Sequence, residues 1–277
     1  YEIKECDWSS DVCSSDLTNS RYDSLQASLN RRMTHNIQAQ VSYTYSKCLG
    51  TGDATLASLA GNTSTLYSNP YDRRPDYSVC GHSVTQSLRL NSLFNLPFRG
   101  NRLIEGWQIT GILAASTGLP FNVTDGVDQS NQINSGAPRP DYAPNNPAVT
   151  VNGISYPACN NSPMIRTVNL WFNPNCFNQQ AFGTLGNFSR EGLYGPGLVN
   201  ADIGFLKSTK IRENLNLQFR AEVFNIFNHT NLSYPAAAVF SGTPSATATL
   251  GRNATAGQIT TYAAPSREIQ FGLKLLF

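Results

Sequence analysis

Polar and apolar residues alternate along several stretches of the chain, each about ten residues long. In the last stretch, Glu268–Phe277, apolar side chains occupy every second position up to a terminal aromatic residue. A period of two places successive side chains on opposite faces of a β-strand, so each stretch predicts a strand with one apolar and one polar face. The pattern predicts strands at about 24–32, 37–46, 84–96, 107–117, 199–208, 215–227 and 268–277.

The connections between these strands alternate in length without exception. Short connections at 34–36, 98–106 and 211–214 alternate with long ones at 49–82, 119–197 and 229–264. Outer-membrane barrels have tight turns at one rim and long loops at the other, whereas a soluble Greek-key sandwich has no reason to segregate loop lengths. We therefore predict an all-β, antiparallel up-and-down meander of about seven long strands. It would form part of a larger transmembrane β-barrel, with long loops at one rim and tight turns at the other.

In such a barrel the apolar face of each strand contacts outer-membrane lipid and the polar face lines the lumen. The candidate lumen-facing residues are four charged residues on the predicted polar face: Arg89, Arg220, Glu222 and Lys274. Bacterial single-chain barrels usually have an even number of strands. Seven strands therefore imply further strands upstream, and the first strand is expected to present an open edge.

Composition agrees with this fold and removes other classes of protein. Of the 277 residues, 14% are charged, compared with about 25% in average soluble domains. The net charge of +2 is too small to indicate nucleic-acid binding. No stretch approaches the roughly 18 consecutive apolar residues of a membrane-spanning helix, which argues against a helical membrane protein.

The first seventeen residues require a separate interpretation. Residues 7–17 resemble the translation of a common sequencing adapter, and the alternative is a polar, disordered leader. We exclude residues 1–17 from the fold in either case, so Cys6 and Cys13 carry no information. Residues 18–277 form the predicted partial barrel.

Four cysteines remain, and they allow three pairings. Cys48 ends one predicted strand and Cys80 precedes the next, while Cys159 and Cys176 lie in one long loop. The most economical pairing is Cys48 with Cys80 and Cys159 with Cys176, at a rim that faces an oxidising exterior. A metal site is the weaker alternative, because no CxxC spacing occurs and the three histidines belong to separate connections.

No catalytic motif is present: the chain has no GxSxG elbow, no HExxH and no Walker lysine. We therefore expect neither an enzyme nor a cofactor. Asp125 and Asp128 with Asn122 are residues of the type that binds calcium, and we interpret them as a polar loop entrance. The segment 72–76, Asp-Arg-Arg-Pro-Asp, is interpreted as a solvated loop, and the alternative is a contact with an anionic ligand or lipopolysaccharide.

Several motifs together resemble the carboxy-terminal part of the Oar-like branch of TonB-dependent outer-membrane receptors, over residues 18–277. These motifs are Tyr22-Asp23-Ser24-Leu25-Gln26-Ala27, Val41-Ser42-Tyr43-Thr44-Tyr45-Ser46-Lys47, Gly106-Trp107-Gln108-Ile109 followed by Thr117-Gly118-Leu119-Pro120-Phe121, Gly192-Leu193-Tyr194-Gly195-Pro196-Gly197 before Asp202, Glu222-Val223-Phe224-Asn225-Ile226-Phe227-Asn228-His229, Gly257-Gln258-Ile259-Thr260 and Arg267-Glu268-Ile269-Gln270-Phe271.

The resemblance implies a plugged barrel of about 22 strands, of which this chain would be the last third. It implies coupling to the TonB system through an amino-terminal region that the sequence lacks. It also implies that the last strand carries a signal for the barrel-assembly machinery. The candidate signal residues are Phe271, Leu273, Leu275 and Phe277.

The sequence thus predicts a fragment of a TonB-dependent transporter or receptor in the bacterial outer membrane, which takes up a large or scarce ligand. The loop 119–197 is the expected ligand-facing segment, because loops of this length are usually functional. The ligand itself is not identified. The alternatives are a passive porin or adhesin barrel, or a secreted glycan-binding β-sandwich. We expect that the isolated fragment does not insert as a closed, heat-modifiable barrel.

Overall fold

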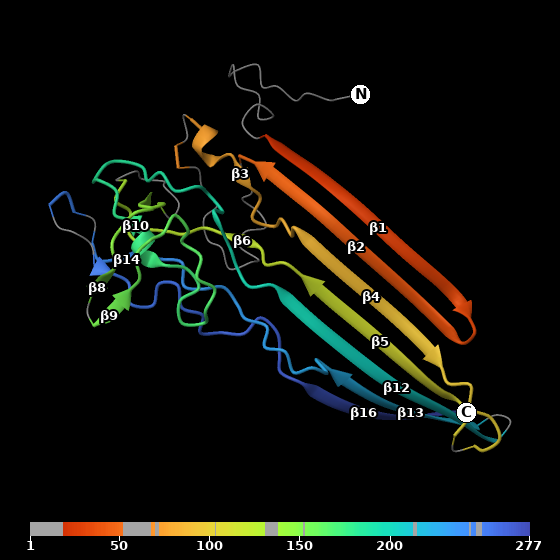
Figure 1. Ribbon diagram of the computed structural model, residues 1–277. Helices are drawn as coiled ribbons and strands as arrows, with labels where there is room; N and C mark the ends of the chain where they lie inside the picture. The colour runs from red at the N-terminus through yellow and green to blue at the C-terminus, as the bar shows by residue number, and fades with distance from the viewer. Residues whose placement is uncertain are drawn as a thin grey trace, which may run out of the picture.

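A single large antiparallel sheet dominates the protein (Figure 1). The computed structural model describes residues 19–51, 68–69, 72–102, 104–130, 138–151, 153–212, 215–243, 245–247 and 251–277. The strand order is β1-β2-β4-β5-β12-β13-β16, so strands adjacent along the meander are adjacent in the sheet. Their bounds are β1 Ser20–Thr34, β2 Ile37–Gly50, β4 Gln86–Asn95, β5 Trp107–Ser116, β12 Leu198–Arg212, β13 Leu215–Phe224 and β16 Glu268–Leu276.

This arrangement confirms the predicted meander and the rhythm of its connections. The chain passes from Thr34 to Ile37, from Asn95 to Trp107 and from Arg212 to Leu215 at the tight-turn rim. It makes long excursions between β2 and β4, between β5 and β12, and between β13 and β16. Long connections therefore all lie at one end of the sheet, which we call the loop rim.

The tight turns have the local chemistry that their geometry requires. His35 and Asn36, which join β1 to β2, have φ values of 49° and 63°. A two-residue hairpin turn with positive φ at both positions matches the right-handed twist of the flanking strands, and asparagine tolerates this conformation. At the next turn, the Lys207 Nζ of β12 donates to the carbonyls of Arg102 (2.7 Å) and Glu105, which holds the turn against the sheet.

One strand ends earlier than its sequence pattern predicts. The pattern extends to about residue 227, but β13 ends at Phe224 because Asn225 has a φ of 50°. The Asn225 backbone N–H donates to the Asp202 carboxylate at 2.8 Å, and its Oδ1 accepts from the His229 N–H at 2.9 Å. These bonds turn the chain away from the sheet and start the last long loop.

The apolar face of the sheet is exposed. On β16, the side chains of Ile269, Phe271, Leu273 and Leu275 are 50–71% exposed. The other sheets in the described residues have two strands each, so none of them covers this face as the second layer of a sandwich would. An uncovered apolar face of this extent requires an apolar environment. In the described residues β1 pairs only with β2 and β16 only with β13, so the sheet is open at both edges.

The compact core lies in the long loops and not in the sheet. Among the described residues, eleven buried ones form this core, and all of them lie between Phe121 and Phe240, outside the seven long strands. Short elements carry the loops: β3 Ser78–Val79, β6 Pro120–Phe121, β7 Asp141–Tyr142, β8 Val149–Val151, β9 Ile154–Tyr156, β10 Phe177–Asn178, β11 Leu193–Tyr194, β14 Phe240–Ser241, β15 Gly251–Arg252, and the 3₁₀ turns η3 Arg74–Asp76 and η4 Pro174–Cys176. No helix in the described part of the chain is long and apolar enough to cross a membrane.

Candidate functional site

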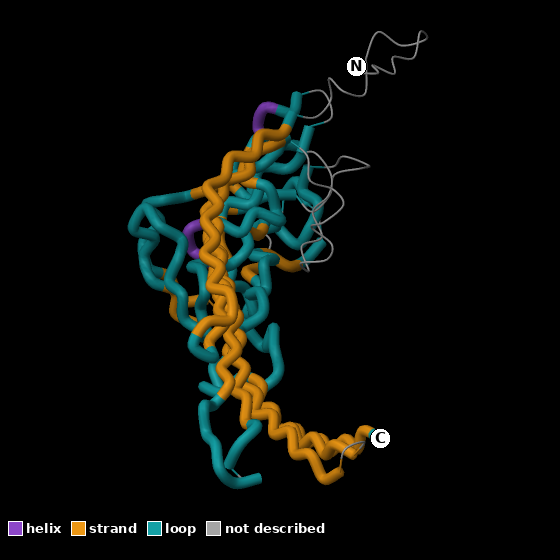
Figure 2. The backbone as a smooth tube through the Cα atoms, turned by 90° about the vertical axis from the view of Figure 1, so that its right-hand side faces the viewer, coloured by secondary structure: helices purple, strands orange, loops and turns teal. Residues whose placement is uncertain are grey.

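The three long connections fold together at the loop rim into one body, which we call the loop cluster. It comprises the described residues of 68–85, 117–197 and 225–267. Figure 2 shows the sheet nearly edge-on, with the loops gathered toward one end of the strands. The cluster also reaches one face of the sheet, since Ser46 and Cys48, which share the face of Ser42, are 5% and 6% exposed.

An aromatic centre holds the loop cluster together. Phe177 is fully buried, and its ring centroid lies 4.9 Å from that of Phe188 and 6.0 Å from that of Phe172, both in edge-on geometry. Tyr142 lies 6.2 Å from Phe177 and closes the group. Edge-to-face aromatic pairs at these distances stabilise a fold by more than the burial of their apolar surface alone. A loop segment of nearly eighty residues can therefore hold a defined shape.

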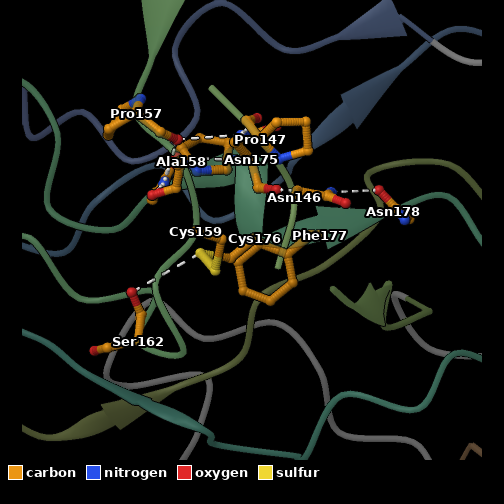
Figure 3. The surroundings of a disulfide bond; sticks show 12 residues. Asn146, Pro147, Pro157, Ala158, Cys159, Ser162, Asn175, Cys176, Phe177 and Asn178 are labelled. Atoms are coloured by element: carbon orange, nitrogen blue, oxygen red, sulfur yellow. Dashed lines mark hydrogen bonds between the residues drawn. A yellow bond between two sulfur atoms is a disulfide. The ribbon is translucent and has the colours of Figure 1, made fainter. Parts of the chain in front are cut away.

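Cys159 and Cys176 form a disulfide beside this aromatic centre, with their Cα atoms 5.0 Å apart (Figure 3). Asparagine side chains surround the bridge and hydrogen-bond to backbone carbonyls. The Nδ2 of Asn146 donates to the Asn175 carbonyl at 2.9 Å, and the Nδ2 of Asn175 donates to the Pro147 carbonyl at 2.7 Å. These bonds satisfy buried carbonyl groups in a segment that has little regular secondary structure.

Cys48 and Cys80 form the second disulfide, with a Cα separation of 5.3 Å. Both bridges therefore have the pairing that the sequence favours. The bridge joins the end of β2 to the segment before β4, and the His82 ring lies next to it: one ring nitrogen and the two sulfur atoms lie within 4.8 Å of one another. In the disulfide form the sulfur atoms are not thiolate ligands, so this group is not a metal site while the bridge is intact.

A buried ion pair joins the first long loop to the second. The Asp76 carboxylate accepts from Arg139 Nη2 at 2.8 Å, and the two side chains are 1% and 4% exposed. The backbone N–H and hydroxyl of Ser68 also donate to Asp76, at 3.0 and 3.1 Å. Burial lowers the pKa of Arg139, although Asp76 opposes this effect. The interpretation of 72–76 as a solvated loop is therefore wrong for Asp76, because a partner 63 residues away neutralises its charge.

Arg190 completes this junction. Its Nε donates to the Asp76 carbonyl at 3.0 Å and its Nη2 to the Gly50 carbonyl at 2.8 Å. The end of β2 and two long loops are thus bound to one another by charged side chains, which have no periodicity that the sequence could reveal.

A pocket of about 590 Å³ lies where the ends of β5 and β12 meet the loop cluster. Trp171, Tyr194 and Arg166 line it, together with two threonines and three glycines. Gly118 lets the segments 117–118 and 194–197 approach closely beside the pocket, because a Cβ there would meet the Gly195 carbonyl at 1.9 Å. The volume is in the usual range for ligand pockets.

Arg166 has a φ of 68°, a strained conformation for a residue other than glycine, and its N–H donates to the Trp171 carbonyl at 2.9 Å. Its side chain is exposed, and none of the described carboxylates pairs with it. Residues with a strained backbone conformation cluster at binding sites and active sites. No sequence pattern marks this pocket, because its lining residues come from four separate segments.

The structure places the four candidate lumen-facing residues on one face of the sheet. Arg89 is opposite Ser42 and Ala114. The other three lie on β13 and β16, where Glu222 is opposite Gly204 and Lys274 is opposite Gln218. Paired residues share a face, so the register connects all four across the sheet.

The candidate assembly-signal residues lie on the opposite, apolar face of β16. Phe271, Leu273 and Leu275 are 70%, 71% and 50% exposed, and Phe277 follows the strand with 99% exposure. The leader at 1–17 lies outside the described residues.

Comparison with known proteins supports the fold. The family model for the outer membrane beta barrel domain matches residues 12–270. No curated protein and no solved structure matches the chain. The match covers most of the sequence and agrees with the meander, the exposed apolar face and the segregated loops. The chain is therefore a bacterial outer-membrane protein and belongs to the outer membrane beta barrel domain family.

Proposed function

We propose that this chain is the carboxy-terminal part of a TonB-dependent outer-membrane transporter or receptor, which binds a large or scarce ligand at its loop rim. The observation that carries the proposal is the loop cluster. Its aromatic core, two disulfides and buried ion pair give the extracellular loops a fixed shape, as recognition of a ligand requires.

The position of the cluster favours a receptor over a passive pore. The cluster buries Ser46 and Cys48 on the face that also carries Arg89 and Glu222. If this face lines the lumen, the folded loops restrict access from outside. A passive porin needs an unobstructed water-filled channel, whereas an active transporter binds its ligand and opens only when energy is supplied.

The pocket indicates the chemistry of the ligand. Trp171 and Tyr194 offer aromatic surfaces, and the Arg166 guanidinium offers a positive charge without a competing carboxylate in the described residues. We propose a ligand with an apolar or ring-shaped part and a negatively charged group. No catalytic role is proposed.

Completion of the barrel and energy coupling require parts beyond the described sheet. We propose that further strands pair with the open edges of β1 and β16, and that a plug and a TonB-contacting segment precede the barrel. Arg89, Arg220, Glu222 and Lys274 would then line the lumen, and the face with Phe271 and Leu273 would contact lipid. The assembly machinery would recognise β16 and Phe277 by strand addition.

The coding sequence upstream of Thr18 tests the proposal. A plug domain with a TonB-contacting segment is expected there, and a complete gene without one would refute TonB coupling. The complete protein should also bind the purified periplasmic domain of TonB and should show little steady conductance in a planar bilayer. Large ohmic conductance without TonB binding would instead support a passive porin.

A further inference from the structure

Asp125 is a buried acidic residue that the described residues leave without a hydrogen-bond partner. It lies in the loop cluster with 0% exposure, and neither carboxylate oxygen forms a hydrogen bond. Gln180 is 1% exposed, and both of its amide atoms are also without partners. Gln129 is fully buried, and its Nε2 is unpaired. Such groups are expensive to bury without partners, and the oxygen atoms of Asp125 and Gln180 lack a donor or a cation.

The surroundings of Asp125 are electrically negative. Burial raises the pKa of Asp125 to about 7; the neighbouring Gln180 amide opposes this rise, and the carboxylates of Asp141 and Asp128 add to it. No arginine or lysine in the described residues forms an ion pair with Asp125. The charge is therefore uncompensated by protein groups, unlike that of Asp76.

The backbone fixes Asp125 in this position. Its N–H donates to the Pro138 carbonyl at 2.8 Å, and its carbonyl accepts from the Phe240 N–H at 3.0 Å. The next residue, Gly126, has a φ of 77°, and a Cβ there would meet the Phe240 carbonyl at 2.4 Å. Asp125 cannot turn toward solvent unless these contacts between two long loops break.

Gln129 is fixed in a similar way. Its carbonyl accepts from the Gly183 N–H at 2.8 Å, and its Oε1 accepts from the Ser245 N–H at 3.1 Å. Four segments of the loop cluster therefore meet at this place. Because a proton on Asp125 would neutralise only one of three neighbouring carboxylates, a divalent cation compensates the negative charge more completely.

We propose that Asp125 and the side-chain oxygen of Gln180 bind a Ca²⁺ ion that holds the second and third long loops together. Ca²⁺ accepts six to eight oxygen ligands in flexible geometry, including carboxylates, amide oxygens and water. Asp128 and Asp141 supply the surrounding negative charge. The acidic pair at 125 and 128 is then part of an ion site and not a polar loop entrance, while Asn122 is separately bonded to Glu191. A site with few direct charges suits an affinity of about 10⁻⁴–10⁻³ M, as in extracellular modules.

The test uses the complete protein in outer-membrane vesicles that have been washed with chelator. The vesicles are held in urea and exposed briefly to protease, at increasing concentrations of Ca²⁺ or Mg²⁺. Cleavage within 119–197 then measures the fraction of molecules whose loop cluster is open. A Ca²⁺ concentration ten times the dissociation constant should reduce cleavage roughly tenfold. Mg²⁺ should protect less, because it demands a small octahedral site and loses water reluctantly.

Matched variants separate the site from general effects of calcium on the membrane. Asp125→Asn, which preserves shape, should abolish the Ca²⁺ protection, and Gln180→Leu should weaken it. Asp72→Asn removes a partly exposed carboxylate from the same rim and should retain the full effect. If Asp125→Asn does not fold, the test is the comparison of Ca²⁺ protection between Gln180→Leu and Asp72→Asn. The proposal then requires weaker protection in Gln180→Leu.

Two results would overturn the proposal. One is that resistance to the protease does not depend on Ca²⁺ and that Asp125→Asn is at least as stable as the original protein. Asp125 would then be a buried neutral carboxyl group. The other is equal Ca²⁺ protection in the Gln180 and Asp72 variants, which would assign the effect to lipid.

Discussion

Replacing Asp76 by asparagine is expected to open the loop cluster. The side chains of Asp76 and Arg139 are 1% and 4% exposed, and their charged atoms are 2.8 Å apart. Asparagine keeps the size of the side chain and one oxygen for the Ser68 donors, but it removes the negative charge. Arg139 is then left buried without the carboxylate that pairs with it.

The expected loss of stability follows from the burial of the ion pair. Removing one partner of a buried ion pair costs about 3–5 kcal/mol, because the remaining charge cannot be hydrated. Arg139→Met should cost less, since Ser68 still donates two hydrogen bonds to Asp76. The double variant has no isolated charge, so its loss of stability should be smaller than that of Asp76→Asn by about 2 kcal/mol.

The free energy of opening can be measured by pulse proteolysis of the complete protein in outer-membrane vesicles across a urea series. The control is Asp72→Asn, because Asp72 pairs with an Arg74 side chain that is 90% exposed, and no measurable change is expected there. Equal effects of Asp76→Asn and Asp72→Asn, or a double variant equal to the sum of the single ones, would refute the assigned role of the ion pair.

Three further changes test other parts of the structure by the same urea series. Replacing Cys159 and Cys176 together by alanine should destabilise the loop cluster by about 3 kcal/mol, because the bridge closes a loop with a sequence separation of 17. An unchanged urea midpoint of opening would show that packing alone fixes this loop. Phe177→Ala should lower the free energy of opening by about 3–5 kcal/mol, because Phe177 is fully buried. Phe182→Ala should lower it by less than about 1 kcal/mol, because Phe182 is 40% exposed. Equal losses would contradict the assigned core. Lys207→Met should cost about 1–3 kcal/mol, because two turn carbonyls lose a charged donor. It should increase cleavage at 98–106 in protein solubilised in detergent, where the protease reaches the tight-turn rim; cleavage at the original rate would show that water replaces the lysine.

The sheet could be predicted from the sequence because the face of each side chain depends only on its position along its own strand. A period of two assigns each side chain to a face, and this was sufficient to place Arg89 and Lys274 on one face and Phe271 on the other. The strict alternation of loop lengths gave the strand order, since short connections join neighbouring antiparallel strands. Strands β2 and β12 extend beyond their predicted ends, to Gly50 and Arg212. Strand β13 instead ends early, because the positive φ of Asn225 is stabilised by contacts with Asp202 and His229.

The loop cluster could not be predicted in the same way. Asp76 and Arg139 are 63 residues apart, and Arg190 reaches the carbonyl of Gly50 across 140 residues. Nothing periodic marks these residues, and their charges alone suggested solvent exposure. Their burial depends on how three long loops pack against one another.

By itself, the sequence determined the strands, their two faces, their order, the rim at which the long loops lie and the economical cysteine pairing. Only the tertiary structure decided that the core lies in the loops, that Arg166 and Trp171 share a pocket, and that Asp125 is buried without a partner. The physical reason is that strand faces are fixed by backbone geometry between neighbouring residues, whereas loop packing is fixed by contacts between segments that are distant in the chain.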